Sequence, residues 1–291
     1  LKHREPRSRP HPAALRMVDL LCGLLRVRRR GISAMGQPSP PQGEAGARKG
    51  IKLVVFDFDQ TLACVHVFKS LAGWGGSGFR VPAPHARSEL GQMVRIGELS
   101  QTAEYSEQGG FAYVAFGGQV RVKSLDQTLS SLRAKDVELV VCSKGLVGTV
   151  NVCLSDLGLL GHFSQVYGRI DGYEGTEFDK QAQRDGPSDA QRRLVGTPEQ
   201  AQWLTKERLI GRLMAQRSLQ HEQVVLVEDD PDEVRSARSV CETILVERAH
   251  GMTEEHFAHL LAMASDRPTA KPATAFTMHP REVKCRNCSI L

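Results

Sequence analysis

The chain has 291 residues, of which 41% are hydrophobic and 24% are charged, as is ordinary for a soluble globular protein. Its formal net charge of +5 is uneven: the first 50 residues hold 11 Lys and Arg against three acidic residues, which leaves the other 241 residues at −3. The basic balance therefore belongs to the leader, and it gives no reason to expect nucleic-acid binding by the rest of the chain.

The first 50 residues are rich in Arg, Pro and Gly, and this composition predicts a disordered basic leader. Residues 13–27 could form an Arg-flanked amphipathic helix of the kind found in organelle transit peptides. The composition as a whole favours a flexible tail over organelle targeting. The best candidate for a membrane span, residues 18–27, is shorter than the roughly 18 apolar residues that a transmembrane helix needs.

From residue 51 onward, short apolar runs alternate with helical patterns. Strands are expected at 51–56, 137–143, 164–168, 223–228 and 243–247, and helices at 122–135, 146–159, 206–219 and 232–240. Continuous apolar strands joined by helices are typical of a parallel sheet covered on both faces. We therefore predict an α/β domain over residues 51–265, built on a Rossmann-like, doubly wound, mostly parallel five-stranded sheet.

Two stretches do not fit this alternation. Residues 63–118 directly follow the first strand and combine Gly-rich segments with a helical pattern at 88–99. We expect this insertion to form a flap hairpin with a helix or two, and so a small cap. Residues 171–203 are polar and loop-like, and are too short for a separate domain.

The cysteines bear on the compartment. Seven cysteines follow no regular spacing, and Cys64, Cys142 and Cys153 lie in or beside apolar segments. Buried free thiols behave as small hydrophobic groups, so we expect a reducing, cytoplasmic compartment.

The first predicted strand runs into two acidic residues, Asp57 and Asp59, which Thr61 follows. In an open parallel sheet, ligands bind beyond the carboxyl ends of the strands, so this pair lies on the functional edge. Residues two apart on a strand point to the same side, so both carboxylates can face one ligand. Neighbouring carboxylates drive their pKa values apart, which suits an ionised nucleophile beside a protonated acid. The alternative is two solvated acids in a loop.

Three further features lie beside predicted strands. The second strand ends at Ser143, whose hydroxyl could hold a phosphoryl oxygen, although a serine there is usually a helix cap. Lys206 opens the helix before the fourth strand, where a lysine is usually a solvated charge. Five acidic residues occupy the six positions 228–233 after the fourth strand. Their charges repel one another unless a cation such as Mg²⁺ binds. The alternative is a solvated acidic turn that charges a helix N-terminus.

The chain order of Asp57/Asp59, Ser143, Lys206 and Asp229/Glu233 resembles that of the haloacid dehalogenase (HAD) superfamily of phosphatases. The resemblance implies that Asp57 is the nucleophile and forms an aspartyl-phosphate. It implies that Asp59 protonates the leaving oxygen and then activates water. Thr61 and Ser143 would bind phosphoryl oxygens, and Lys206 would offset the charge of nucleophile and phosphate.

The resemblance also implies a Mg²⁺ cofactor. Mg²⁺ would be held by Asp57, the backbone carbonyl of Asp59 and Asp229, with Glu233 close by. Glu228 and Glu233 stand where many relatives have shorter residues, and we expect the extra methylene to loosen the metal geometry. Asp230 is a rival ligand.

The expected function is a magnesium-dependent phosphomonoester hydrolase. A small cap would leave the site open to a bulky phosphoester or a phosphoprotein, with a phosphorylated small molecule as the alternative. A phosphomutase would use the same nucleophile but needs a lid that excludes water. A catalytically silent phosphate-binding or scaffold protein with the HAD fold is the alternative from another class.

The last 26 residues, 266–291, are rich in Pro, Thr and Ala, and predict a flexible tail. The tail ends in Cys-Ser-Ile-Leu, which fits prenylation at Cys288, and the terminal Leu favours geranylgeranyl. A prenyl group would hold a cytoplasmic protein peripherally on a membrane. The pair Cys285 and Cys288 could instead suggest metal or redox chemistry, but no second Cys/His pair accompanies it.

Overall fold

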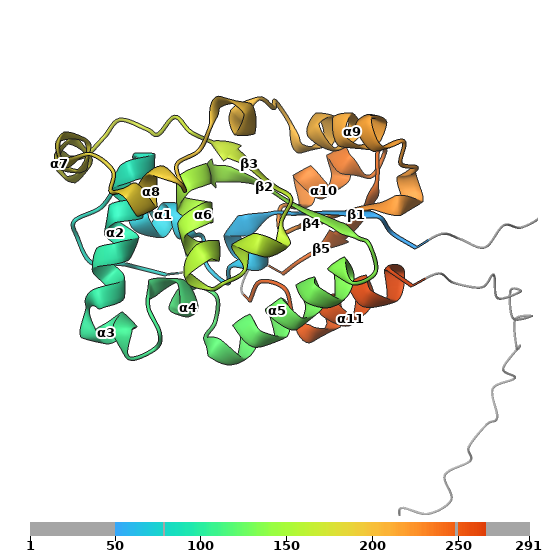
Figure 1. Ribbon diagram of the computed structural model, residues 1–291, viewed down its shortest axis with the longest axis horizontal. Helices are drawn as coiled ribbons and strands as arrows, with labels where there is room; N and C mark the ends of the chain where they lie inside the picture. The colour runs from blue at the N-terminus through green and yellow to red at the C-terminus, as the bar shows by residue number, and fades with distance from the viewer. Residues whose placement is uncertain (1–49, 78, 248–249, 266–291) are drawn as a thin grey trace, which may run out of the picture. The chain divides into compact units, whose positions relative to one another are not determined.

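The centre of the fold is a five-stranded sheet with the strand order β3-β2-β1-β4-β5 (Figure 1). The structure is a computed structural model that describes residues 50–77, 79–247 and 250–265. The predicted tail with Cys288 and all of the predicted leader except Gly50 lie outside the described residues. The strands are β1 (Leu53–Phe56), β2 (Glu138–Leu146), β3 (Gln165–Arg169), β4 (Val224–Glu228) and β5 (Glu242–Leu245).

All four strand pairings are parallel, which confirms the predicted fold class. The strands follow the apolar runs of the sequence, and β2 continues past its predicted end at Ser143 to Leu146. The register pairs Phe56 at the end of β1 with Val141 on one side and Val227 on the other. The carboxyl ends of β1, β2 and β4 therefore meet at one edge of the sheet.

Helices cover both faces of this sheet. They are α1 (Val67–Ala72), α2 (Glu89–Gln101), α3 (Ala103–Ser106), α4 (Phe111–Ala115), α5 (Gln119–Arg133), α6 (Val147–Asp156), α7 (Glu177–Asp185), α8 (Asp189–Arg192), α9 (Lys206–Arg217), α10 (Pro231–Ala237) and α11 (Glu254–Met263). Short helical turns lie at Phe58–Leu62, Leu160–His162, Pro198–Ala201 and His221–Gln223. Within the described part of the chain, none of these helices has the length and apolar character to cross a membrane.

Alternate residues of β1 enter two hydrophobic clusters. Val54 and Phe56 pack with residues of α5, α6 and α11, whereas Leu53 and Val55 pack with residues of α9 and α10. Figure 1 accordingly shows α9 and α10 on one side of the sheet and α5 and α11 on the other. All four β1 side chains are fully buried. A carboxylate that directly follows this strand therefore lies next to the apolar core.

The insertion at 63–118 differs from the expected flap hairpin. Its described residues form the helices α1 to α4 and contain no strand. Met93, Ile96 and Phe111 of this insertion belong to the same hydrophobic cluster as Val54 and Phe56 of β1. The insertion therefore extends the main core. The Gly-rich segments, which suggested hairpin turns, supply helix ends: Gly73 ends α1 in the left-handed conformation, with φ 70°.

The polar stretch at 171–203 is also more ordered than expected, because it contains α7, α8 and a short helical turn. Capping boxes start both helices, with Thr176 and Asp179 at α7 and Ser188 and Gln191 at α8. The Asp179 carboxylate also accepts hydrogen bonds from the Ser88 backbone and hydroxyl groups. It thereby joins the start of α7 to the start of α2.

The cysteines among the described residues are free thiols, as expected. Cys142 and Cys153 are buried, and Cys64 is partly exposed. Burial raises the pKa of the Cys142 thiol to about 12, so this residue is a neutral core group.

Candidate active site

Asp57 lies at the point where β1 ends. Its backbone N–H donates to the Val227 carbonyl of β4 at 2.9 Å, which holds it at the carboxyl edge of the sheet. Asp57 is 5% exposed. A carboxylate this deeply buried is stable in ionised form only beside cationic or hydrogen-bonding partners. The positions of its neighbours therefore decide its chemistry.

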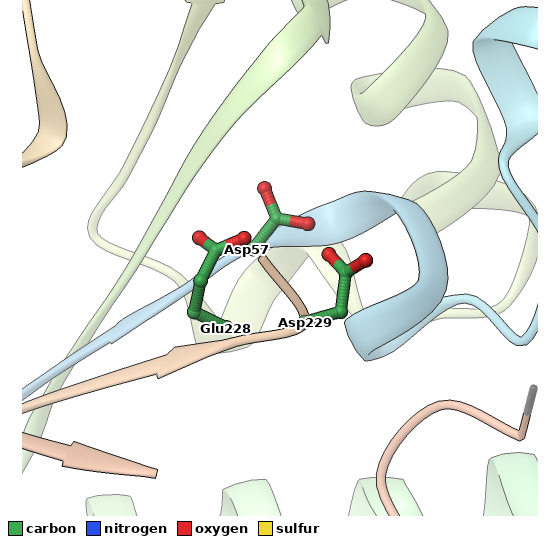
Figure 2. A group of neighbouring side chains, drawn as sticks. All are labelled: Asp57, Glu228 and Asp229. Carbon is green, nitrogen blue, oxygen red and sulfur yellow. The ribbon is translucent and has the colours of Figure 1, made fainter. Parts of the chain in front are cut away.

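Three carboxylates converge at this edge. Those of Asp57, Glu228 and Asp229 each have an oxygen atom within 4.8 Å of the other two, and Figure 2 shows them clustered where β1 and β4 end. Mg²⁺ binds oxygen at about 2.0–2.1 Å, so two ligands on opposite sides of one ion lie roughly 4.2 Å apart. The side chains are thus within a small adjustment of a shared ion. A set of hard carboxylate oxygens, two of them on buried residues, fits Mg²⁺.

A buried cation faces the same carboxylates. Lys206 is 1% exposed, and its ammonium donates to Asp57 Oδ1 at 2.5 Å and to Glu228 Oε2. Lys206 is the first residue of α9, where the partial positive charge of the helix N-terminus disfavours a lysine. The two carboxylates account for its position. Glu228 also accepts from the Asp230 backbone N–H at 3.2 Å, so both of its oxygens have partners.

Burial sets the protonation of this cluster. It raises the pKa of Asp57 to about 6, and the charge of Lys206 offsets part of the increase. Burial and the charge of Asp57 raise the pKa of Glu228 to about 8. Burial lowers the pKa of Lys206, but the two carboxylates outweigh it and the net pKa is raised. Lys206 is therefore charged, and Asp57 ionises more readily than Glu228. A divalent cation would stabilise the ionised form of both acids.

Asp59 lies in the helical turn that follows Asp57. Its Oδ1 accepts from the Phe68 backbone N–H at 3.3 Å. The other oxygen, Oδ2, lies 3.1 Å from Nδ1 of His66, at an angle that does not meet hydrogen-bond geometry. The next residue, Gln60, has φ 62°, which bends the chain so that the turn leaves the sheet. The insertion thus supplies partners for Asp59 from residues 66–68.

Ser143 and Gly145 lie in β2 beside this turn. Ser143 is fully buried, and its hydroxyl accepts from the Gly145 backbone N–H at 2.9 Å. A side chain at Gly145 would begin 3.1 Å from Ser143 Oγ and 3.4 Å from Asp59 Oδ2. Lys144, between them, is largely exposed and pairs with Glu233 at 2.6 Å. A side chain at 145 would therefore crowd the Ser143 hydroxyl, whereas its distance from Asp59 is an ordinary contact.

These side chains line one cavity of about 300 Å³. Five of the residues predicted from the sequence lie in its wall: Asp57, Asp59, Ser143, Lys206 and Asp229. The wall also contains Gln60, His66, Lys69, Lys144, Glu228 and Asp230. The cavity thus combines a buried nucleophile candidate, a second carboxylate, a hydroxyl and cationic groups around a space that fits a phosphoryl group.

Two predicted site residues lie outside this wall. Thr61 is fully buried, and its hydroxyl lacks a hydrogen-bond partner among the described residues; its phosphate-binding role stays a prediction. Glu233 pairs with Lys144 and is absent from the carboxylate cluster, in which Glu228 stands instead. The run of acids at 228–233 signalled a cation site, but a run in a turn does not reveal which side chains point inward.

His66 and Lys69 were not singled out from the sequence. Both line the cavity from the start of the insertion, His66 just before α1 and Lys69 within it. The available signal for these two cavity residues was that a histidine and a lysine follow shortly after the carboxylate pair at the end of the first strand. Nothing in their spacing shows that the chain turns back over the site.

The chain matches no protein-family model and no curated protein. Among solved structures, it is similar to a haloacid dehalogenase-like family hydrolase from Streptococcus pneumoniae, at 16% identity over 72% of this chain and 90% of that one, with a TM-score of 0.35. It is similar to a phosphatase-containing fragment from Bacteroides fragilis in complex with Mg, at 12% identity over 77% of this chain and 42% of that one, with a TM-score of 0.38. It is also similar to the HAD domain of a Legionella pneumophila effector, an inactive mutant, at 12% identity over 74% and 95% of the two chains, with a TM-score of 0.41. At these identities and scores, the chemistry has to be judged from the residues of the chain itself.

Proposed function

We propose that this chain is a magnesium-dependent phosphomonoesterase of the HAD type, with Asp57 as its nucleophile. One observation carries the proposal. Asp57 is buried at the carboxyl edge of the sheet, with Lys206 on one of its oxygens and Asp229 within reach of a shared ion. Burying several carboxylates together with a lysine costs stability. Such clusters of perturbed acids in a cavity are typical of functional sites.

Mg²⁺ would be held by Asp57 and Asp229, with Glu228 as the third carboxylate of the cluster. Both carboxylate oxygens of Glu228 already have partners, the Lys206 ammonium and the Asp230 backbone N–H, so we assign Glu228 first to Lys206. When bound, the cation supplies positive charge that neutralises the phosphoryl oxygens. We assign Glu233 no direct role, because it pairs with Lys144.

Asp57 would attack phosphorus. Lys206 donates to Oδ1, which fixes the orientation of the carboxylate and leaves Oδ2 to form the new bond. As the Asp57–phosphorus bond forms, the bond from phosphorus to the alcohol oxygen breaks, and Asp59 gives that oxygen a proton. Ser143 lies in the cavity wall and would hold a phosphoryl oxygen.

Asp59 would then act in the second half of the reaction. Having lost its proton, it accepts one from a water molecule, and that water attacks the phosphorus of the aspartyl-phosphate. The Asp57–phosphorus bond breaks, inorganic phosphate leaves, and both carboxyl groups return to their starting state. The contact of Asp59 with the Phe68 N–H fixes the side chain for both proton transfers.

Phosphate release from an aryl phosphate tests this proposal. We expect release that depends on added Mg²⁺, is lost with a chelator and falls at least about a thousandfold in Asp57→Asn. Asp232→Asn is the matched control, because Asp232 is an exposed acid of the same run that lies outside both the carboxylate cluster and the cavity wall. If wild type is no faster than Asp57→Asn across several phosphate esters, the chain is a silent phosphate-binding or scaffold protein.

We also propose that Cys288 is prenylated and holds the protein on a membrane. The support is the Cys-Ser-Ile-Leu ending and the nearby basic residues Arg281, Lys284 and Arg286. Membrane fractionation of the intact chain in eukaryotic cells, compared with Cys288→Ser, tests this. Equal distribution of the two between membrane and soluble fractions would contradict it.

A further inference from the structure

A second pocket opens beside the catalytic cavity. It has a volume of about 440 Å³, larger than the catalytic cavity at about 300 Å³. Lys144 lines both, so the two are neighbours at the same edge of the sheet. The mechanism described above makes no use of this second pocket.

A fixed tyrosine ring forms one wall. The Arg169 guanidinium carbon lies 4.4 Å from the centre of the Tyr173 ring, and its Nη1 donates to the Tyr173 hydroxyl at 2.5 Å. Phe68 and Trp74 pack against the same ring, with centroids 5.3 Å and 4.9 Å away. A ring held by several partners loses little freedom when a ligand packs on its remaining surface. Tyr173 keeps 43% of its surface exposed.

A second part of the pocket wall is also apolar and anchored. Trp203 donates its indole N–H to the Gly168 carbonyl of β3 at 3.2 Å. Leu204 follows it on the rim and is 78% exposed. A single exposed leucine is ordinary on a protein surface. Here it lines the same pocket as two anchored rings, so the pocket wall contains three large apolar side chains.

The charges in the pocket balance. Lys144 and Arg169 contribute two positive charges, and Asp171 and Glu233 contribute two negative ones. Lys144 and Glu233 are paired at 2.6 Å, and Arg169 is stacked on Tyr173. A pocket without net charge does not attract a polyanion or a strongly charged alcohol. It suits an uncharged group with an apolar or aromatic surface.

We propose that this second pocket binds the alcohol part of the substrate and selects phosphate monoesters whose alcohol carries a large, uncharged aromatic group. The inference rests on the proposed phosphatase function. With its phosphoryl group in the catalytic cavity, such a substrate passes Lys144 and packs its aromatic part against the Tyr173 and Trp203 side chains. The pocket thereby determines which phosphate esters are hydrolysed well.

Two esters with similar leaving groups but different size test the inference. Phenyl phosphate and biphenyl-4-yl phosphate both release a phenol, so their intrinsic reactivity is similar. We expect wild type to prefer the biphenyl ester by about tenfold in kcat/KM, as additional apolar surface in a binding pocket allows. Leu204→Asp should reduce the preference to about twofold or less. Val120→Asp is the matched control, since Val120 is 83% exposed on α5 and lines neither pocket.

Binding to the Asp57→Asn protein separates this inference from the proposed function. Calorimetry with both esters, in Asp57→Asn with and without Leu204→Asp, measures the pocket without turnover. If wild type hydrolyses both esters with equal kcat/KM, the pocket inference is wrong and the phosphatase function is upheld. A binding preference that Leu204→Asp abolishes, in a protein whose wild type does not hydrolyse either ester, upholds the pocket and overturns the phosphatase. If the protein neither hydrolyses the esters nor binds one in preference to the other, both the pocket inference and the phosphatase function are overturned. Equal melting temperatures of the variants ensure that folding is not the cause.

Discussion

Removal of the Lys206 charge is the most informative perturbation of the carboxylate cluster. Lys206→Met keeps the approximate volume of the side chain but leaves the carboxylates of Asp57 and Glu228, 5% and 2% exposed, without their ammonium partner. Breaking a buried pair by removing one partner costs about 3–5 kcal/mol when the remaining charge stays ionised. If the carboxylates take up protons instead, the cost falls to about 1–3 kcal/mol for poorly satisfied polar groups.

The loss of stability should therefore depend on pH. Burial raises the pKa values of Asp57 and Glu228 to about 6 and 8, and without Lys206 they rise further, because Lys206 lowers both. The unfolded chain releases these protons near pH 4. A group with a raised folded-state pKa destabilises the fold increasingly as pH rises from the unfolded to the folded pKa. We expect Lys206→Met to lose about 1–3 kcal/mol at pH 5.5 and about 3–5 kcal/mol at pH 8.5.

Urea unfolding without Mg²⁺ at the two pH values measures this loss. The double variant Lys206→Met/Glu228→Gln should be more stable than Lys206→Met at pH 8.5, because it leaves one buried carboxylate without an ammonium partner where Lys206→Met leaves two. Its phosphatase activity should stay as low as that of Lys206→Met, since Asp57 still lacks its orienting partner. A Lys206→Met protein as stable as wild type at pH 8.5 would refute this reasoning.

Three further predictions concern the site and its supports. Gly145→Ala should lower kcat roughly tenfold to a hundredfold while leaving the melting temperature nearly unchanged, because the new Cβ, 3.1 Å from Ser143 Oγ, displaces the hydroxyl in the cavity wall; unchanged kinetics would contradict this. Asp179→Ala should cost roughly 2–4 kcal/mol in urea unfolding, because Ser88 and Thr176 lose their common acceptor; a loss below about 1 kcal/mol would argue against a supporting role. Mg²⁺ affinity measured by calorimetry should rise from pH 5 to pH 7, because protons compete for Asp57, whose pKa burial raises to about 6; an affinity independent of pH would exclude Asp57 as a ligand.

The sequence predicts the sheet and the strand-end residues well, because both follow from local pattern. Four hydrophobic residues in succession, Leu53 to Phe56, are consistent with a strand buried on both faces, and the structure buries all of them. Parallel strands bring their carboxyl ends to one edge, so Asp57 and Asp229 come together although 172 positions separate them.

The directions of side chains beyond the strand ends could not be predicted in this way. Periodicity stops where the strand ends: Glu228, the last residue of β4, contacts Lys206, whereas Glu233, already in α10, pairs with Lys144. The extra methylene of Glu228, which suggested loose metal geometry, lets its carboxylate contact a buried ammonium. His66 reaches Asp59 because the chain bends at Gln60, whose positive φ has no signature in its residue type.

Of the helices at 63–118, α2 follows the helical pattern predicted at 88–99. The shorter helices there and those at 171–203 were missed for different reasons. In the first, glycines that suggested hairpin turns are helix ends, such as Gly73 after α1. In the second, low hydrophobicity hid α7 and α8, although Thr176 with Asp179 and Ser188 with Gln191 have the spacing of capping boxes. Capping residues were therefore the better guide in a polar segment.

A phosphorylated Asp57 would be the most direct evidence for the mechanism. In Asp59→Asn, the second half of the reaction lacks its base, so an aspartyl-phosphate should accumulate after mixing with Mg²⁺ and an aryl phosphate. Acid quenching followed by peptide mass spectrometry should find one phosphoryl group on the peptide that contains Asp57, and none in Asp57→Asn/Asp59→Asn. A phosphoryl group on Ser143 or His66, or turnover by wild type with no phosphorylated peptide in Asp59→Asn, would contradict the assignment of Asp57 as the nucleophile.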